Sequence, residues 1–332
     1  MADALVSPAV GGTMLAVSAG AVAYAVKKTG VMDEKKIPVM GVMGAFVFAA
    51  QMINFTIPGT GSSGHIGGGI LLAAVLGPCP ALLTLAAVLL IQCLFFADGG
   101  LLAYGCNVFN MGVTACFLAF NLVYRPIAGD GRSKKRIAWA ACASVILGLQ
   151  GGAFSVVLET LASGVTELPF GAFALLMQPI HLAIGLVEGL VTAGVLVYVH
   201  GLRPELLESA LTNQALRPSL SLRRVLITLA AAAVITGGLL SLFASAFPDG
   251  LEWAVEGAAG RAELERPGPV HEAAGRAVEK TALMPDYGFS GDDSGSPLGT
   301  AAAGLAGGLI TVVIAGGLGF VIRKAARGAH RV

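Results

Sequence analysis

A glycine-rich segment, residues 54–69, holds the side chain best suited to binding a metal ion. It reads N-F-T-I-P-G-T-G-S-S-G-H-I-G-G-G, and His65 is the only histidine among the first 180 residues. A neutral imidazole is the commonest metal ligand among protein side chains. Gly and Pro permit irregular backbone, which at membrane depth is tolerated only where protein or a cavity covers it. The residues alone leave two interpretations open. One is a turn, anchored by Asn54 and Ser63, that presents His65 to a metal ion; the other, which the composition favours, is an outer-loop histidine that only hydrogen-bonds to water or backbone.

A second polar segment, residues 96–111, contains Asp98, Asn107 and Asn110 as its only strongly polar side chains. Simple capping of helix ends by Asp and Asn is the interpretation that these residue types favour. The other interpretation is that they hydrogen-bond to the first segment and hold it in place, as residues around a metal site do.

His181 and Glu188 form a third group, within a long apolar run. Seven residues make nearly two helical turns, so both side chains share one face of a helix. Ionisable side chains inside a membrane are functional by default, and a proton relay or a subunit contact is one interpretation. A buried polar pair satisfied by neighbouring helices is the other.

The composition places these groups in a membrane protein. Of 332 residues, 55% are hydrophobic and 12% are charged, and the mean hydropathy is +0.79, whereas soluble domains carry about 25% charged residues. The net charge of +1 excludes a basic nucleic-acid-binding protein. A transmembrane helix needs about 20 mainly apolar residues. Eight clear segments and one shorter one, 66–79, predict nine spans: 9–26, 37–55, 66–79, 81–97, 107–124, 138–158, 178–200, 225–247 and 299–322.

The basic residues predict the orientation in the membrane, because Lys and Arg concentrate in cytoplasmic loops. Four groups hold 17 of the 21. If all four are cytoplasmic, the N-terminus is outside, the C-terminus is inside, and 159–177 is an outer or re-entrant segment. The groups are Lys27, Lys28, Lys35 and Lys36; Arg125, Arg132, Lys134, Lys135 and Arg136; Arg203, Arg217, Arg223 and Arg224; and Arg323, Lys324, Arg327 and Arg331.

An acidic segment, residues 248–297, separates the last two predicted spans. It holds 10 of the 20 Asp and Glu residues, and we expect a large extracytoplasmic loop that is helical between 269 and 281. The fold class is thus an all-α polytopic membrane protein with a seven-span body and two C-terminal transmembrane helices. Its predicted parts are 1–205, a cytoplasmic linker 206–224, and 225–332.

The chain offers little of its own for enzymatic chemistry. It contains no G-x-x-x-x-G-K-[ST] and no H-E-x-x-H motif, and its five cysteines form no C-x-x-C pair. It therefore predicts neither an ATPase nor a zinc protease nor a thiolate zinc site. Transport is favoured over catalysis.

Three stretches resemble the substrate-binding component of cobalt/nickel energy-coupling-factor transporters, the CbiM/NikM family. They are A-D-A-L-V-S-P-A-V-G-G (2–12), G-H-I-G-G-G (64–69) and A-D-G-G-L-L-A-Y-G-C-N-V-F-N-M-G (97–112), and the resemblance covers about residues 1–205. F-P-D-G-L-E-W (247–253), M-P-D-Y-G-F (284–289) and the last helix resemble the PDGLE-type accessory subunit, CbiN/NikN, fused in one chain.

This resemblance implies capture of Ni(II) or Co(II), as transported substrate, at the outer face of the cell membrane. It implies no organic cofactor, and it implies a membrane coupling (T) subunit and a cytoplasmic ABC-type ATPase as partners. A stand-alone proton-coupled transporter that uses His181 and Glu188 is the alternative. Nickel is weakly favoured by the fused accessory segment, whose loop is expected to act on the binding loop.

The ligands implied by the resemblance are nitrogens of the N-terminus, a histidine at position 2, and a loop histidine that corresponds to His65. This chain departs from that pattern, since it begins Met1-Ala2-Asp3. We expect that a Met-His precedes Met1 in the native protein. Without it, the Met1 amine is the remaining N-terminal ligand, and we predict weak Ni(II) binding.

Overall fold

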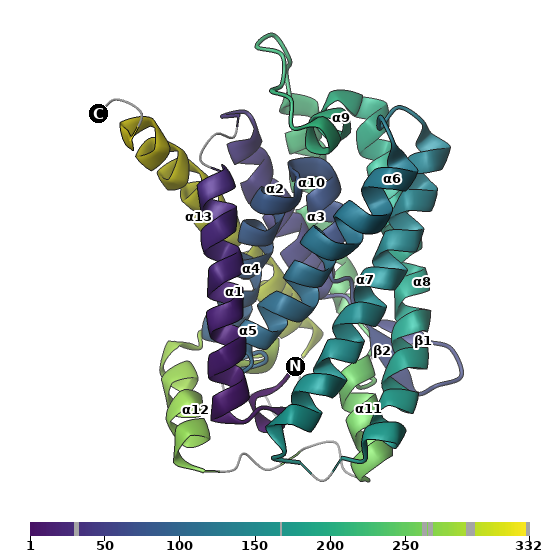
Figure 1. Cartoon of the computed structure of the whole chain (residues 1–332), viewed down its shortest axis with the longest axis vertical. Helices are drawn as coiled ribbons and strands as arrows, with labels where there is room; N and C mark the ends of the chain where they lie inside the picture. Colours follow the sequence, from purple (N-terminus) through teal and green to yellow (C-terminus); the bar gives the residue numbers. More distant parts are fainter. Residues whose placement is uncertain (30–32, 167, 261–263, 265–267, 290–295, 330–332) are drawn as a thin grey trace.

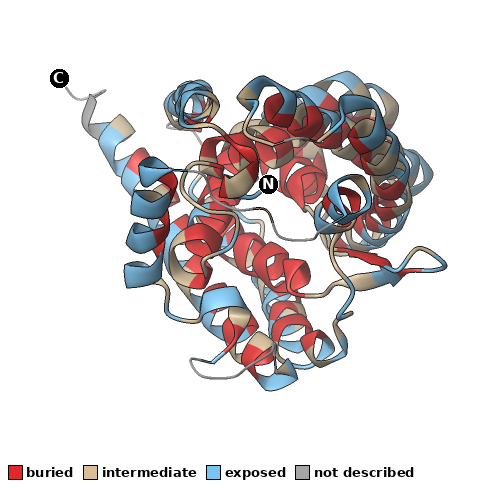
Figure 2. Cartoon of the chain, turned by 90° about the horizontal axis from the view of Figure 1, so that it is seen from below, coloured by how far each residue is buried: buried red, intermediate tan, exposed pale blue. Residues whose placement is uncertain are grey.

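The computed structural model describes residues 1–29, 33–166, 168–260, 264, 268–289 and 296–329. Three charged residues of the predicted groups, Asp292, Asp293 and Arg331, lie outside these ranges. So do Arg261, Glu263, Glu265 and Arg266. The described residues form a helical bundle (Figure 1). Figure 2 shows that buried residues gather in its middle and exposed residues on its outside.

Seven helices in the described part of the chain are long and apolar enough to cross a membrane. Large apolar side chains such as Leu122 and Leu175 are 73% and 74% exposed on their outer faces. This arrangement confirms a multi-pass membrane protein. The helices are α1 (Pro8–Thr29), α4 (Pro78–Phe96), a continuous helix of α5 (Tyr104–Asn107), the π-helix η2 (Val108–Tyr124) and α6 (Arg125–Ala128), then α7 (Lys134–Ser163), α8 (Phe170–Leu202), α10 (Arg223–Gly238) with the 3-10 turn η3 (Leu240–Phe243), and α13 (Pro297–Ala329).

Two of the nine predicted spans are shorter than expected. Helix α2 (Lys36–Gln51) has 16 residues, and α3 (Gly69–Leu76) has eight, which cover about 24 and 12 Å of helix axis. Helix α3 begins only at Gly69, because Gly68 is left-handed with φ 77°. Buried side chains of α2 reach both ends of the segment that contains α3: Gln51 Nε2 donates to Gly67 O at 3.1 Å, and Lys36 Nζ to Leu76 O at 3.3 Å.

The all-α prediction needs a correction between α2 and α3. Strands β1 (Phe55–Ile57) and β2 (Ser62–Gly64) form an antiparallel hairpin in which Phe55 pairs with Gly64. Its turn contains Gly59 and Gly61, both at positive φ, a conformation that glycine adopts without steric cost. The hairpin ends directly before His65.

The C-terminal segment packs along the body and folds over one of its ends. Helices α10 and α13 lie against α2, while α11 (Gly250–Ala259) and α12 (Pro269–Thr281) lie at the end of the bundle that holds the N-terminus (Figure 1). Helix α12 spans the predicted residues 269–281. Helix α11 was not predicted. It begins at a capping box, in which the Asp249 side chain accepts the Leu251 and Glu252 amides.

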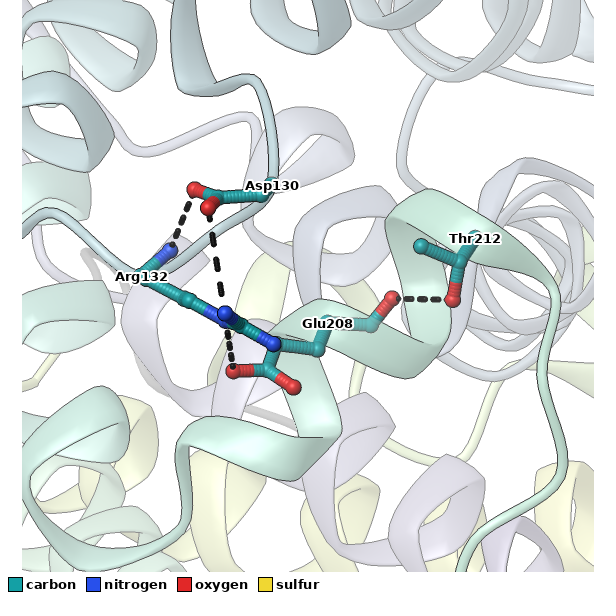
Figure 3. A network of polar contacts seen from close by, with 4 residues as sticks. All are labelled: Asp130, Arg132, Glu208 and Thr212. Carbon is teal, nitrogen blue, oxygen red and sulfur yellow. Dashed lines mark hydrogen bonds and ion pairs between the residues drawn. The ribbon is translucent and has the colours of Figure 1, made fainter.

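The opposite end of the bundle gathers described residues from all four basic groups. Helix α9 (Pro204–Thr212) lies there, and Glu208 pairs with Arg132 at 3.4 Å (Figure 3). Lys35 Nζ donates to the carbonyl oxygens of Arg217 and Leu220, both at 2.8 Å. Arg323 pairs with Glu34 at 3.0 Å. Segments that are far apart in the sequence therefore meet at one face.

The contact between α10 and α13 depends on a glycine pair. A Cβ added at Gly304 would lie 2.7 Å from Gly237 O, whereas one at Gly317 on the same helix would meet nothing within 4 Å. We expect Gly304→Ala to lower the free energy of unfolding by about 1–3 kcal/mol, the usual cost of overpacking. Gly317→Ala is the matched control and should not destabilise the protein. Unfolding in detergent micelles measures both, and equal stability would contradict the close approach of the two helices.

Candidate metal site

A cavity of about 140 Å³ lies among α7, α8, η2 and the His65 turn. This volume is the space open to the centre of a water-sized sphere, of which one water needs roughly 10–15 Å³. The cavity therefore has room for several waters or for a hydrated ion. Six of the residues predicted to form the site line it: Met1, His65, Asn107, Asn110, His181 and Glu188.

The N-terminal segment is fastened to the start of the third long helix. The Met1 amine donates to Asn107 Oδ1 at 2.7 Å, and Asn107 Nδ2 donates to Met1 O at 3.0 Å. Asp3 Oδ1 accepts the Ala103 amide at 2.8 Å, and the Asp3 amide donates to Gly99 O at 2.9 Å. Because Asn107 contacts only main-chain atoms of Met1 in these bonds, the same clamp suits a terminal amine or a peptide N–H.

The turn that carries His65 is held by a buried carboxylate. Glu188 is 4% exposed, and its Oε1 accepts the Gly68 amide at 2.9 Å. A Cβ at Gly64 would lie 2.5 Å from Ile184, one turn earlier on α8 than Glu188. The glycines thus let the turn lie directly on α8, where His65 reaches the cavity.

His181 and Glu188 face the same cavity, as their spacing predicted, but they have different partners. His181 Nδ1 lies 2.8 Å from Met177 O, one turn earlier on its own helix. A ring nitrogen that donates to a carbonyl leaves the other nitrogen free to accept a proton or to bind a metal ion. Glu188 instead bonds to the turn after His65.

Among the described residues, no three His, Cys, Asp or Glu side chains are grouped closely enough to hold a metal ion. A metal bound in this cavity therefore needs donors of another kind in addition to imidazole. Met1 lines the cavity together with His65.

Four residues predicted to anchor the turn bond mainly to other parts of the chain. Asn110 Nδ2 donates to Glu159 Oε2 at 2.7 Å. Asn54 O accepts the Ser245 amide at 2.7 Å, and Ser63 Oγ donates to Phe247 O at 2.8 Å. Asp98 Oδ2 accepts the Tyr287 hydroxyl at 2.6 Å. Asn54, Ser63 and Asp98 thus connect the body to the C-terminal segment, which sequence spacing alone does not reveal.

Burial and the neighbouring Asp98 carboxylate raise the pKa of Tyr287 well above its ordinary value of 10. The phenol therefore keeps its proton at neutral pH and donates it to Asp98. This bond ties the segment after α12 to the end of α4.

Two features of the cavity were missed by sequence reasoning. The start of α11, residues 249–251, forms part of its wall, where a Cβ at Gly250 would lie 3.2 Å from His181 Cε1. Trp253 Nε1 donates to Thr60 O at 2.9 Å and holds this start of α11 on the hairpin. The other feature lies behind the cavity wall: Glu159, which is 7% exposed, is bonded to the lining residue Asn110. A lone acidic residue at the end of an apolar run was the available signal.

The fold and the cavity define a polytopic membrane protein with a partly open cavity, lined by apolar and polar residues, at one end of its helical bundle. The chain belongs to the CbiM family, described as the cobalt uptake substrate-specific transmembrane region, whose family model matches residues 1–206. A PDGLE domain matches residues 223–324. These matches confirm the resemblance seen in both parts of the sequence.

Similar proteins have names that refer to metal transport. The chain is 35% identical over 299 residues to a protein of Archaeoglobus fulgidus named "Putative fused nickel transport protein NikMN", covering 89% of each chain. It is 33% identical over 179 residues to the cobalt transport protein CbiM of Sorangium cellulosum, covering 52% of this chain and 76% of that one. A crystal structure of a truncated transition metal transporter is similar with a TM-score of 0.54 and 28% identity, covering 60% of this chain and 98% of that one.

Proposed function

We propose that this chain is the substrate-capture subunit of an ATP-driven energy-coupling-factor importer for Ni(II) or Co(II). The observation that carries the proposal is that Met1 and His65 line one cavity, in a chain of the CbiM family. The two residues lie more than 60 residues apart in the sequence, and a metal ion bound by both is the reason we propose for their shared place.

The proposed ligands are nitrogens, from His65 and from the N-terminal segment. Nitrogen donors suit Ni(II) and Co(II), and geometry rather than raw affinity selects between divalent metals. Ni(II) is favoured, because the relative that shares the fused arrangement over 89% of this chain is named for nickel transport. The metal is the transported substrate, and the proposal includes no organic cofactor.

The proposed orientation places the N-terminus and the cavity outside the cell, and the C-terminus in the cytoplasm. The clustering of the basic groups at the opposite end of the bundle supports it, since positively charged loops remain cytoplasmic. The cavity then lies on the extracytoplasmic side, where the metal is supplied. Nine crossings fit this orientation if α2 and the segment 66–79 each cross the membrane once.

Two partners complete the proposed importer. One is a membrane coupling subunit, and the other is a cytoplasmic ABC-type ATPase. The absence of a G-x-x-x-x-G-K-[ST] motif from the sequence supports a division of labour in which ATP hydrolysis occurs on another chain.

Uptake of radioactive Ni(II) into proteoliposomes tests this function. We expect no uptake with this chain alone under an imposed proton gradient, and uptake when the coupling subunit, the ATPase and ATP are present. ATP replaced by a non-hydrolysable analogue is the control. Gradient-driven uptake by the chain alone, lost in Glu188→Gln, would establish the proton-coupled alternative instead.

A further inference from the structure

Two buried oxygen atoms next to the cavity lack a nitrogen or hydroxyl donor among the described residues. Asn110 and Glu159 are 6% and 7% exposed, and they are joined by the bond from Asn110 Nδ2 to Glu159 Oε2. Asn110 Oδ1 and Glu159 Oε1 have no such donor, and the Cys106 thiol, a weak donor, is the other group that hydrogen-bonds to the Glu159 carboxyl. Buried oxygens in native proteins are nearly always satisfied, so this pair is suited to an additional ligand.

The pair lies beside the part of the cavity wall that η2 and α7 form. Asn110 lines the cavity, and so do Gly152 and Val156 of α7. Glu159 follows Gly152 and Val156 at spacings of seven and three residues, which places the three on one helical face. The charge of the Met1 amine also acts on the Glu159 carboxylate.

The chemistry of the pair favours a cation. A buried carboxylate is costly to ionise unless positive charge offsets it. The Met1 amine contributes such charge, but it forms no ion pair with Glu159 among the described residues. Carboxylate and amide oxygens, completed by water, are the donors that hard divalent ions accept in octahedral geometry. The cavity has room for those waters.

We propose that Glu159 Oε1 and Asn110 Oδ1 form an oxygen-donor site for a hydrated divalent cation, next to the nitrogen ligands and distinct from them. The inference rests on the proposed function insofar as the cavity holds a divalent metal. It assigns Glu159 the role of receiving the ion with part of its water shell, before nitrogen ligands replace that shell.

Mn(II) is the appropriate probe, because it prefers oxygen ligands and its hydrated form gives a six-line electron paramagnetic resonance signal that is lost on binding. We expect the full chain to bind one Mn(II), and Glu159→Gln to weaken this binding at least tenfold. Glu208→Gln, which removes a carboxylate at the opposite end of the bundle, is the matched control and should bind as the unaltered chain does. Equal Mn(II) affinity in Glu159→Gln, or no bound Mn(II) in the unaltered chain, would overturn the proposal.

Two further variants separate this site from the proposed nitrogen site and from misfolding. His65→Ala should change the Mn(II) affinity less than twofold, so the oxygen site can be detected even if the nitrogen site does not exist. Asn110→Asp adds a second carboxylate oxygen and should tighten Mn(II) binding at least fivefold, a gain that a damaged fold does not produce. A weaker or unchanged affinity in Asn110→Asp would contradict the assignment.

Discussion

Adding the dipeptide Met-His in front of Met1 is expected to raise the affinity for Ni(II) at least about 100-fold over the chain that begins at Met1. Loss of a group outside a coordination sphere typically changes metal affinity about 10–100-fold, and the added imidazole and amine are donors themselves. Isothermal titration of both forms with Ni(II), followed in parallel by absorbance, measures the difference.

The structure explains why the added residues would reach the cavity. Asn107 holds the main-chain N and O of Met1, and both bonds persist when the amine becomes a peptide N–H. The chain therefore continues from a fixed point in the cavity wall, and a histidine directly before Met1 begins beside His65 and His181. The control is a Met-Ala extension, which adds the same length of backbone and a terminal amine but no imidazole. Equal Ni(II) affinity of the Met-His and Met-Ala forms would show that the second imidazole is not a ligand.

Removing the imidazole at position 65 should have the second large effect. In the chain extended by Met-His, His65→Ala is expected to lower the Ni(II) affinity at least about 100-fold, because a direct ligand contributes more than the 10–100-fold of a supporting group. The loss should also appear as a change in the absorbance bands of bound Ni(II), since the number of nitrogen ligands falls.

The matched control for this variant is His200→Ala. His200 lies near the end of α8 that is remote from the cavity and is not among the residues that line it. This variant removes one imidazole from the same helix that carries His181 but outside the cavity. It therefore measures how much Ni(II) affinity is lost when any histidine is removed. If His65→Ala and His200→Ala bind Ni(II) equally well, the loop histidine has only a structural role.

Much of the architecture follows directly from hydropathy, because a long apolar run in a membrane has few alternatives to a helix. The runs 107–124, 138–158 and 178–200 all appear as long helices, and 269–281 is a helix with the predicted limits. The observed helix boundaries differ from the predicted ones where local hydrogen bonds override hydropathy. The predicted span 66–79 contains only α3, because the glycines before it bond to Glu188 and Gln51 instead of continuing a helix.

The sequence indicated which residues line the cavity more fully than it indicated which residues they hydrogen-bond to. The chemistry of His65, Asn107, His181 and Glu188 is visible from residue type and spacing, and the structure brings all four to one cavity. The partners of Asn54, Ser63 and Asp98 lie almost 200 residues away in the sequence. Periodicity and spacing are local quantities and contain no information about contacts at that separation.

Amino-acid composition, apolar run length and charge placement thus decide that this chain spans a membrane and which basic segments lie at the same end. Tertiary packing alone decides that Met1 and His65 line one cavity, that Glu188 holds the turn, and that the start of α11 forms part of the cavity wall. The physical reason is that these contacts depend on close approach between glycine backbone and distant side chains. Such an approach is set by the packing of whole helices rather than by the residues near any one of them in the sequence.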